Sequence, residues 1–252
     1  RLAFIFLSAS CCTRVESINH LLDDSLPPIP EGIKVGAYYY PWHGNDFHRD
    51  DGYLRDLLDP RQQPFLGEYD DTRPEVIAQH LAWSRQANIR LWVCSWWGPG
   101  AREDTTITNV IMKHTELGDH QIALLYETTG RIKRNENFDP IRVRPDIEHM
   151  CVTYFDHRNY YKVDGKPVIL IYLTRLLHEQ GILVDIVGIM RETAMQYCNK
   201  ELFIIGDQVW GRAPNQNTVY TAFDVLDAVT SYDLYGNMNK PPYAGQAVID
   251  DY

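Results

Sequence analysis

Long hydrophobic runs and clustered basic residues are both missing from this sequence. Its 24 Lys and Arg are outnumbered by 34 Asp and Glu, which gives a formal net charge of -10. Nucleic acids and anionic membrane surfaces bind clustered Lys and Arg, so we expect neither as a partner. No run reaches the roughly 20 apolar residues that a membrane-spanning helix requires. Uncharged ligands such as sugars are compatible with this composition.

Cysteine is also scarce, and its spacing excludes common metal sites. Of the 5 Cys, Cys94, Cys151 and Cys198 lie far apart and lack the spacing of a zinc site. We expect each to be a small buried residue, and their spacing does not decide whether two of them form a disulfide. His43 and His48 have no third ligand at a suitable spacing, so neither a metal nor another cofactor is predicted.

The chain begins with Arg1 rather than Met and continues with the apolar run Leu2–Leu7. Together with the small residues before Cys11, this predicts the end of a secretory signal over residues 1–22 whose start is missing. A bacterial lipoprotein signal has the same form, which makes Cys11 or Cys12 a candidate lipid anchor. The alternative is a short strand. We therefore expect an exported protein, extracellular or periplasmic, with lipid anchoring to a membrane as one form of export.

Beyond a Pro-rich segment over residues 23–33, interpreted as a linker, apolar runs of strand length alternate with amphipathic stretches of helix length. The six predicted strands are Lys34–Tyr40, Arg90–Trp96, Gln121–Glu127, Pro167–Leu173, Leu202–Asp207 and Ala228–Tyr232. They are continuous apolar runs, as in parallel strands that are covered on both faces. Strand–helix alternation predicts an α/β fold. Because no Gly-rich nucleotide-binding loop follows the first strand, a (β/α)₈ TIM-type barrel is favoured over a doubly wound sheet.

Six strands are too few for a complete barrel. One strand with its connecting helix takes about 30 residues, and the last predicted strand is followed only by residues 233–252. We therefore expect residues 34–252 to form an incomplete barrel, truncated after about six strands.

Three helices are predicted from their starts and their apolar faces. The first has a capping-box pattern, Thr72-Arg73-Pro74-Glu75, and then the face Val76, Ile77, Leu81 and Ser84. The second is expected to begin at Pro145 and to bury Ile147, Met150, Cys151 and Tyr154. The third spans Val184–Cys198 and is expected to bury Val187, Met190, Ala194 and Tyr197.

Aromatic rings and carboxylates follow the predicted strands, where a TIM barrel has its active site. The segments are Tyr38–Asn45, Ser95–Gly100, Tyr126–Arg131, Asp207 and Tyr232-Asp233. Aromatic rings stack on the apolar faces of sugars, and carboxylates accept hydrogen bonds from hydroxyl groups or transfer protons to a glycosidic oxygen. No local signature of a Ser-His-Asp or Cys-His site is present. Packing explains any single aromatic residue more simply, but their occurrence on several strands predicts a carbohydrate site.

Several of these motifs resemble glycoside hydrolase family 99, which holds endo-α-1,2-mannosidases and endo-mannanases. The most specific is Ser95-Trp96-Trp97-Gly98-Pro99-Gly100, and further similar stretches are Tyr39–Trp42, Leu66–Tyr69, Arg73–Leu81, Tyr126–Arg131, Gly165–Tyr172 and Phe223–Tyr232. The resemblance covers about residues 34–235. It implies a retaining endo-acting α-mannosidase on a (β/α)₈ barrel, without a metal cofactor, that acts on an α-mannan-like glycan.

The resemblance also implies how the reaction is divided among residues. The family's catalytic pair are two Glu in an Asn-Glu-Trp-His-Glu motif after the last strand. One deprotonates the sugar 2-hydroxyl to give a 1,2-anhydro intermediate, and the other is the acid/base. This motif is absent from the 252 residues, so we expect the chain as it stands to be inactive. The substrate contacts that the resemblance implies are Tyr39, Tyr40, Trp96, Trp97, Glu127 and Tyr232.

Three alternatives stay open at this point. The family's His-Ile-Glu-Pro-Tyr element is Leu125–Thr129 here, and its Asp-Ser-Tyr is Leu173-Thr174-Arg175, so another α-glycan is a candidate substrate. A sugar-binding or polysaccharide-biosynthesis protein on the same scaffold is a second interpretation. The third is hydrolysis by Glu127 paired with Asp207 or Asp233. The oligomeric state is not predicted.

Overall fold

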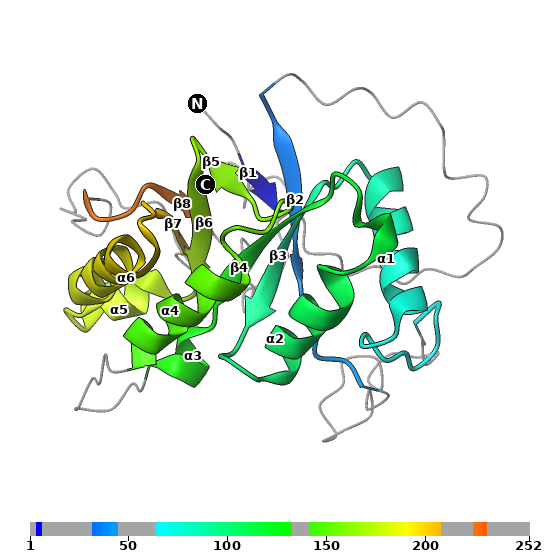
Figure 1. The fold of residues 1–252 in the computed structure, drawn as a ribbon, viewed down its shortest axis with the longest axis horizontal. Helices are drawn as coiled ribbons and strands as arrows, with labels where there is room; N and C mark the ends of the chain where they lie inside the picture. Colours follow the sequence, from blue (N-terminus) through cyan, green and yellow to red (C-terminus); the bar gives the residue numbers. More distant parts are fainter. Residues whose placement is uncertain (1–3, 7–31, 45–63, 133–141, 208–223, 231–252) are drawn as a thin grey trace, which may run out of the picture. The chain divides into compact units, whose positions relative to one another are not determined.

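The computed structural model describes residues 4–6, 32–44, 64–132, 142–207 and 224–230 (Figure 1). The chain divides into two compact units. Unit 1 comprises Arg1–Ser95 and Gly100–Ile122, and unit 2 comprises Trp96–Pro99 and Ala123–Tyr252. In both units strands alternate with helices along the chain.

Unit 1 contains parallel strands in the order β1-β2-β3. Its elements are β1 (Phe4–Phe6), β2 (Lys34–Tyr39), α1 (Pro74–Gln86), β3 (Leu91–Trp96, of which the last residue belongs to unit 2), α2 (Arg102–Thr106), the π-helical turn η3 (Ile107–Ile111) and the 3₁₀ turn η4 (Thr115–Leu117). Every residue of β3 is buried, which explains why it is a continuous apolar run. Gly36 of β2 pairs with Leu91 of β3, and a Cβ on Gly36 would lie 3.2 Å from the Leu91 side chain.

Unit 2 contains parallel strands in the order β4-β6-β7-β8. Its elements are β4 (Gln121–Tyr126, which begins in unit 1), α3 (Thr128–Arg131), α4 (Val143–Thr153), β5 (Lys162–Val163), β6 (Lys166–Ile171), α5 (Thr174–Glu179), α6 (Leu183–Cys198), β7 (Phe203–Asp207) and β8 (Ala228–Thr230). The short β5 pairs antiparallel with β6. The two residues between them, Asp164 and Gly165, both have positive φ, as a two-residue hairpin turn requires.

All six predicted strands are present, with ends that differ by at most two residues; Ser231 and Tyr232 of the last predicted strand lie outside the described residues. Residues Tyr40, Glu127, Tyr172 and Leu173 fall just outside strands, because each begins the loop or helix at a strand's carboxyl end. Parallel pairing holds within each unit. The strand–helix alternation predicted from the sequence is therefore confirmed.

The predicted capping box at the start of α1 is wrong. The N-cap residue is Arg73, and its side chain makes no capping bond. The Thr72 hydroxyl instead donates to Asp70 at 2.7 Å, because an acidic residue two positions earlier offers a closer acceptor than the helix. Pro74 stands in the first turn as predicted, and the buried residues of the helix are the predicted Val76, Ile77, Leu81 and Ser84.

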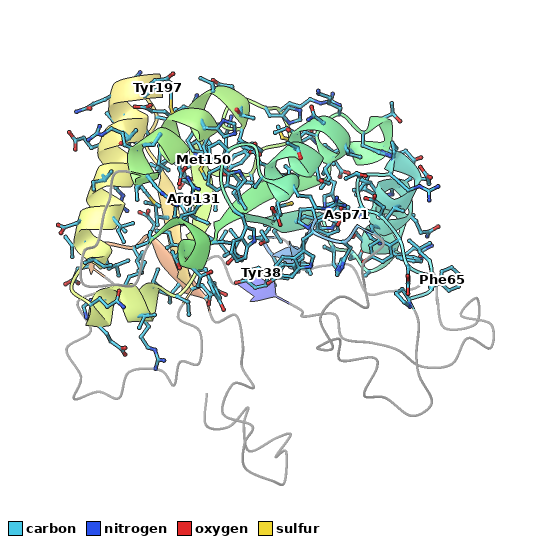
Figure 2. All side chains as sticks on the ribbon, turned by 90° about the horizontal axis from the view of Figure 1, so that it is seen from below. Tyr38, Phe65, Asp71, Arg131, Met150 and Tyr197 are labelled. Atoms are coloured by element: carbon cyan, nitrogen blue, oxygen red, sulfur yellow. A yellow bond between two sulfur atoms is a disulfide. The ribbon has the colours of Figure 1, made fainter. Side chains whose placement is uncertain are left out.

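The other two helices are also confirmed, with two corrections. Helix α4 begins at Val143 rather than Pro145, so the proline lies inside the first turn, where its missing N–H costs nothing. In α6 the predicted Tyr197 is wrong as a core residue, because it is 53% exposed (Figure 2). The apolar face of α6 is formed further back on the helix, by residues that include Ile186, Val187 and Met190.

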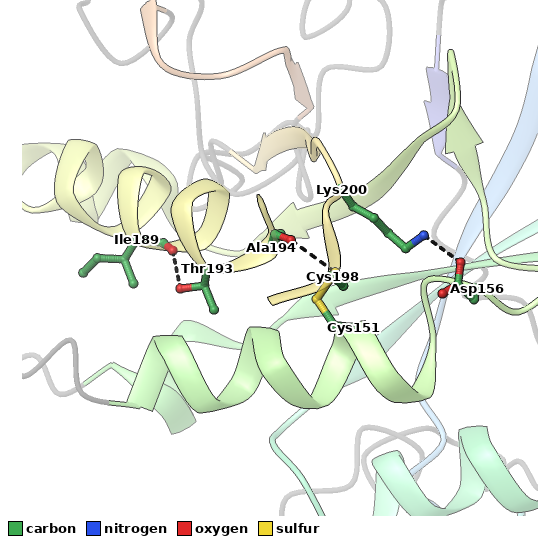
Figure 3. The surroundings of a disulfide bond; sticks show 7 residues. All are labelled: Cys151, Asp156, Ile189, Thr193, Ala194, Cys198 and Lys200. Atoms are coloured by element: carbon green, nitrogen blue, oxygen red, sulfur yellow. Dashed lines mark hydrogen bonds and ion pairs between the residues drawn. A yellow bond between two sulfur atoms is a disulfide. The ribbon is translucent and has the colours of Figure 1, made fainter. Parts of the chain in front are cut away.

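A disulfide joins α4 to α6, which answers the question that the cysteine spacing left open. Cys151 and Cys198 are bonded (Figure 3), and Cys94 is a free, buried cysteine. The expectation of burial holds for Cys151, which is 3% exposed, and is wrong for Cys198, which is half-buried. The two helices pack against each other, and Lys200, just after α6, forms an ion pair of 2.6 Å with Asp156, just after α4.

The apolar segment near the start of the chain forms the three-residue strand β1, parallel to β2. The sequence analysis gave a short strand as the alternative to an export signal, and the structure contains that strand. Export directed by this segment stays a prediction. Cys11, Cys12 and residues 23–31 of the predicted linker lie outside the described residues. Among the helices of the described residues, none has the length and apolar character to cross a membrane.

We predict that the disulfide contributes strongly to the stability of unit 2. It closes a loop across a separation of 47 residues, and loops of this length correspond to about 3–4 kcal/mol of lost unfolded-state entropy. The double variant Cys151→Ser/Cys198→Ser should therefore unfold at a lower urea concentration than the wild type under oxidising conditions. Reductant should lower the midpoint of the wild type and leave that of the double variant unchanged. Equal midpoints for the two oxidised proteins would contradict the prediction.

Candidate functional site

Backbone hydrogen bonds hold the carboxyl ends of the strands in unit 2. The Glu127 N–H, just after β4, donates to the Trp96 carbonyl at 3.1 Å. The Tyr172 N–H, just after β6, donates to the Tyr126 carbonyl at 3.2 Å. These bonds extend the ladder by one residue beyond the strands, so the residues that follow leave the sheet from fixed positions.

Two threonine hydroxyls continue this series at the same end of the strands. Thr128 donates to the Tyr172 carbonyl at 2.8 Å, and Thr174 donates to the Asp207 carbonyl at 3.0 Å. Each hydroxyl thereby donates to a backbone carbonyl at the end of the neighbouring strand. The ends of β4, β6 and β7 are therefore tied together by side chains as well as by the sheet.

Leu173 lies between two of these tied residues and has a left-handed backbone, with φ of 60° and ψ of 37°. A left-handed conformation costs about 1–2 kcal/mol for a residue other than glycine. Strain of this kind persists where the surrounding structure enforces it, often at functional sites. The strained residue is also the first of the Leu173-Thr174-Arg175 stretch that departs from the family pattern.

The two adjacent tryptophans after β3 have different surroundings. Trp96 is fully buried, and its ring stacks on Tyr126 and on His149 with centroid separations of 5.8 and 6.2 Å. Trp97 is half-buried. A sugar contact by either residue stays a prediction, but the burial of Trp96 makes Trp97 the better candidate for such a contact.

A buried ionic network supports the end of β4. Asp146 of α4 has no exposed surface. Its Oδ2 accepts hydrogen bonds from the Tyr126 hydroxyl at 2.7 Å and from the Arg131 Nε at 2.8 Å, and Arg131 also pairs with Oδ1. The hydrogen bond to Asp146, with its negative charge, raises the pKa of the Arg131 guanidinium above its ordinary value. A two-point arginine pair of this kind fixes geometry as well as charge.

Gly98 lies against this network. Its φ is 123°, and a Cβ added there would lie 2.6 Å from an Arg131 nitrogen. The glycine of the Trp-Trp-Gly-Pro-Gly motif is therefore required both by its backbone conformation and by the close guanidinium. This contact connects the loop that carries Trp97 to Arg131 and through it to Asp146.

Glu127 lies immediately after β4 and is 4% exposed. A buried carboxylate at the carboxyl end of a barrel strand stands where such enzymes place reacting and binding groups. Its contact with substrate stays a prediction. Asp207, the residue proposed to pair with it for hydrolysis, is also buried, and this pairing stays a prediction. Asp233, the other candidate partner, lies outside the described residues.

In unit 1, the side chain of Tyr39 is already engaged by protein groups. Its hydroxyl lies 2.9 Å from the His80 Nδ1, and its ring stacks on Trp92 at 4.2 Å, with 8° between the planes. Burial raises the pKa of Tyr39 well above its ordinary value and lowers the pKa of His80 to about 4. Both groups are therefore neutral at pH 7, and the tautomer of His80 decides which of them donates the hydrogen bond. A sugar contact by Tyr39 stays a prediction.

The next two aromatic residues of the motif form a more accessible pair. Tyr40 and Trp42 stack with ring centroids 4.5 Å apart and 29° between the planes. Trp42 is 40% exposed, and His43 meets its ring edge-on at 6.4 Å. Tyr40 was predicted as a substrate contact, and this contact is untested. Trp42 was not among the predicted substrate contacts, although it lies in the segment Tyr38–Asn45 that was expected at the mouth of the barrel.

Four residues, which we call the clasp, fix the backbone directly after Trp42: His43, Asp70, Asp71 and Arg102. The His43 N–H donates to the Asp71 Oδ2 at 2.7 Å. The His43 carbonyl accepts from the Asp71 N–H at 3.0 Å and from Arg102 at 2.6 Å. The same Arg102 nitrogen lies 2.7 Å from Asp70 and 2.9 Å from Asp71. Both backbone polar groups of His43 are thereby held by charged residues distant in sequence.

The carboxylates of the clasp differ in their pKa. Burial, the largest effect, raises the pKa of Asp71 to about 6, although the His43 N–H and the positive charge of Arg102 oppose it. Burial would also raise the pKa of Asp70, but hydrogen bonds from Thr72 and Arg102 bring it below its ordinary value. Asp71 (Figure 2) is 1% exposed. The clasp therefore holds two negative charges at neutral pH, of which the buried one is lost first on acidification.

The clasp was not predicted from the sequence. Asp70 and Asp71 precede the first helix, and Arg102 follows the Gly-Pro-Gly motif, but no short motif connects residues about thirty positions apart. Of the predicted substrate contacts, Tyr232 lies outside the described residues. His48, which was considered and rejected as a metal ligand, lies outside them too. Within the described ranges, no three His, Cys, Asp or Glu residues are grouped so that they could hold a metal ion.

We predict that Asp71 makes stability depend on pH between about 4 and 6. Its pKa is higher in the folded state than the ordinary value of 3.8, so the folded protein binds this proton more tightly than the unfolded chain. Relative to Asp71→Asn, the wild type should therefore gain stability as the pH falls from 6 to 4, by about 1 kcal/mol per pH unit. Urea unfolding of both proteins at several pH values measures this. A stability difference that is constant with pH would refute the raised pKa.

We also predict that Gly98→Ala is more disruptive than Gly100→Ala. Both glycines have positive φ, but nothing lies within 4 Å of a Cβ on Gly100. Gly100→Ala should cost about 1–2 kcal/mol for the backbone alone. Gly98→Ala adds the displacement of Arg131 and should cost clearly more, as measured by thermal unfolding. Equal losses for the two variants would mean that the Arg131 contact is unimportant.

Comparisons with known proteins agree on one family. The model of glycosyl hydrolase family 99 matches residues 34–183. The chain is 25% identical over 166 residues to a human glycoprotein endo-alpha-1,2-mannosidase-like protein, covering 54% of this chain and 36% of that protein. It is 25% identical over 181 residues to the rat glycoprotein endo-alpha-1,2-mannosidase, covering 62% of this chain and 36% of that protein. The chain thus spans about a third of the length of these relatives.

The solved structures agree in fold. The GH99 endo-alpha-mannosidase from Bacteroides thetaiotaomicron aligns with a TM-score of 0.55 at 22% identity, over 79% of this chain and 58% of that one. A glycoside hydrolase-like protein aligns with the same TM-score at 20% identity, over 84% of this chain and 62% of that one. The (β/α)-barrel class expected from the sequence is confirmed by this likeness. With the family model matching more than half of its residues, the chain belongs to glycosyl hydrolase family 99.

Proposed function

We propose that this chain is part of a retaining, endo-acting α-mannosidase that cleaves an α-mannosidic linkage inside a glycan. The observation that carries the proposal is the family match over residues 34–183. Relatives and solved structures named as endo-mannosidases support the same class of substrate. Half-buried and exposed aromatic residues at strand ends, such as Trp97 and Trp42, suit the stacking of sugar rings.

The proposed chemistry requires two carboxyl groups on either side of the scissile bond. One would take the proton of the sugar 2-hydroxyl, so that its oxygen attacks the anomeric carbon, and the other would protonate the leaving oxygen and later activate water. The Asn-Glu-Trp-His-Glu motif of the family is absent from the 252 residues. We therefore assign glycan binding rather than acid–base chemistry to this chain, with Glu127 as a binding carboxylate.

The proposal is tested by measuring new reducing ends on an α-1,2-linked mannan. The 252-residue chain and the product of the complete reading frame should be compared side by side, with the anomeric form of the first product followed by NMR. We expect turnover with retained configuration only for the complete protein. Turnover by the 252 residues alone would show that carboxylates present here perform the chemistry. An inverted product would exclude the retaining mechanism.

We predict that Glu127→Gln in the complete protein weakens glycan binding as well as turnover. A neutral amide accepts weaker hydrogen bonds from hydroxyl groups than a carboxylate does, by roughly a factor of two in energy. KM should rise several-fold, whereas the exposed control Glu179→Gln should leave it unchanged. Binding measured by calorimetry separates the two roles: an unchanged affinity together with a loss of kcat would make Glu127 a reacting group instead.

A sugar-binding or polysaccharide-biosynthesis protein without hydrolytic activity is the second candidate. The departure at Leu173-Thr174-Arg175, where the backbone is strained, is the observation that favours it. Tight mannan binding by the complete protein without any new reducing ends would support this candidate. Cleavage of a different α-glycan would instead support a hydrolase with altered specificity.

We also propose that the protein is exported, with Cys11 or Cys12 as a candidate lipid anchor. The apolar run Leu2–Leu7 and the small residues that follow it support this. The disulfide between Cys151 and Cys198 supports it independently, because disulfides persist mainly in oxidising compartments. The mass of the N-terminal peptide of the native protein tests the proposal: an acylated Cys at the mature N-terminus is expected, and an intact peptide that still contains Leu2–Leu7 would contradict it.

A further inference from the structure

We propose that the clasp of His43, Asp70, Asp71 and Arg102 positions the Tyr40–Trp42 pair as a flat surface on which a sugar ring stacks. Arg102 and Asp71 are then positioning residues, and Trp42 is the substrate contact. The inference rests on the proposed function for the identity of the ligand, but the positioning itself does not depend on it.

The first step of the argument is the accessibility of the pair. In the short segment 40–44 that directly follows β2, Trp42 is the exposed aromatic residue, at 40%, and Tyr40 is half-buried. The Tyr40 ring lies against it at 4.5 Å, and the His43 ring meets its edge. The indole is therefore supported from within the protein and still has exposed surface. An exposed, supported aromatic face at the carboxyl end of a barrel strand is suited to a sugar ring.

The second step is that hydrogen bonds hold the backbone directly after Trp42 in place. The His43 N–H and carbonyl both bond to the clasp, and Gly44 forms an antiparallel bridge with Asp70. A Cβ on Gly44 would lie 3.2 Å from the Arg102 guanidinium, so this arginine lies directly over the loop. A loop held from both sides in this way has little freedom to move the indole away.

The third step concerns the energetic weight of the clasp. Asp71 is almost fully buried, and Arg102 is its charged partner at 2.9 Å. Removing one member of a buried ion pair leaves the other charge without compensation, which costs far more than breaking a surface pair. Arg102 bonds to the loop carbonyl and to both carboxylates with one nitrogen. A lysine could keep the charge but not the planar geometry of the guanidinium.

The experiment uses the complete protein labelled with 5-fluorotryptophan, whose fluorine NMR spectrum should contain one resonance for each Trp, including the 6 Trp of these 252 residues. Trp42→Phe assigns the Trp42 signal. Arg102→Gln should shift or broaden this signal and leave that of Trp83 in place, whereas the control Arg85→Gln, which removes an exposed ion pair with Glu116, should leave the Trp42 signal unchanged. Because no ligand is added, an unmoved Trp42 signal in Arg102→Gln would overturn the positioning role whatever the substrate is.

Kinetics on the mannan then test the contact. Trp42→Ala should raise KM about tenfold with little change in kcat, since it removes binding common to the ground and transition states. Arg102→Gln should raise KM by about three- to tenfold, Arg102→Lys should restore part of the loss, and the double variant Trp42→Ala/Arg102→Gln should be no worse than Trp42→Ala alone. Multiplying effects in the double variant, or an unchanged KM in Trp42→Ala, would overturn the proposal. Failure of the wild type to cleave the mannan, with the fluorine result intact, would instead reject the proposed substrate.

Discussion

In parallel strands that are buried on both faces, the backbone groups at the strand ends need hydrogen-bond partners within the protein. The structure of unit 2 depends on the groups that serve as these partners. The N–H groups of Glu127 and Tyr172 and the hydroxyls of Thr128 and Thr174 serve as those partners. Each partner is itself at a strand end. The groups that satisfy the sheet therefore also fix the loops from which a glycan would be contacted, so stability and site geometry share the same hydrogen bonds.

Both units reinforce their loops with a buried carboxylate, but they use it differently. In unit 2, Asp146 receives Arg131 and the Tyr126 hydroxyl and is joined to the tryptophan loop through the close approach of Gly98. In unit 1, Asp71 receives a backbone N–H and Arg102. The network around Asp146 holds the end of β4 through side chains, and the clasp holds the loop after Trp42 through its backbone. In the clasp, burial raises the pKa of Asp71 to about 6, so the loop after Trp42 responds to mild acid.

Much of the fold could be predicted from the sequence, because buried strands and helix faces appear in it as apolar residues at characteristic spacings. Strand β3 is buried at every position and is apolar except for Ser95, and the buried face of α1 was predicted residue by residue. The errors arose where one local interaction replaced another: Thr72 bonds to Asp70 instead of capping the helix. The tie between Arg102 and Asp71 could not be predicted, because it depends on two loops meeting in space. The family resemblance rests on short motifs such as Ser95–Gly100, which do not depend on knowing the fold.

The disulfide between α4 and α6 has a consequence for the topology of the chain. By joining Cys151 to Cys198, it turns the intervening segment, which contains β5, β6 and α5, into a closed covalent ring. A single peptide-bond cut anywhere inside that ring leaves the two pieces attached to each other. A protease that nicks an exposed turn such as the one at Gly181 would therefore produce no separate fragments until the sulfur bridge is reduced, and the nicked protein could retain the arrangement of its strands.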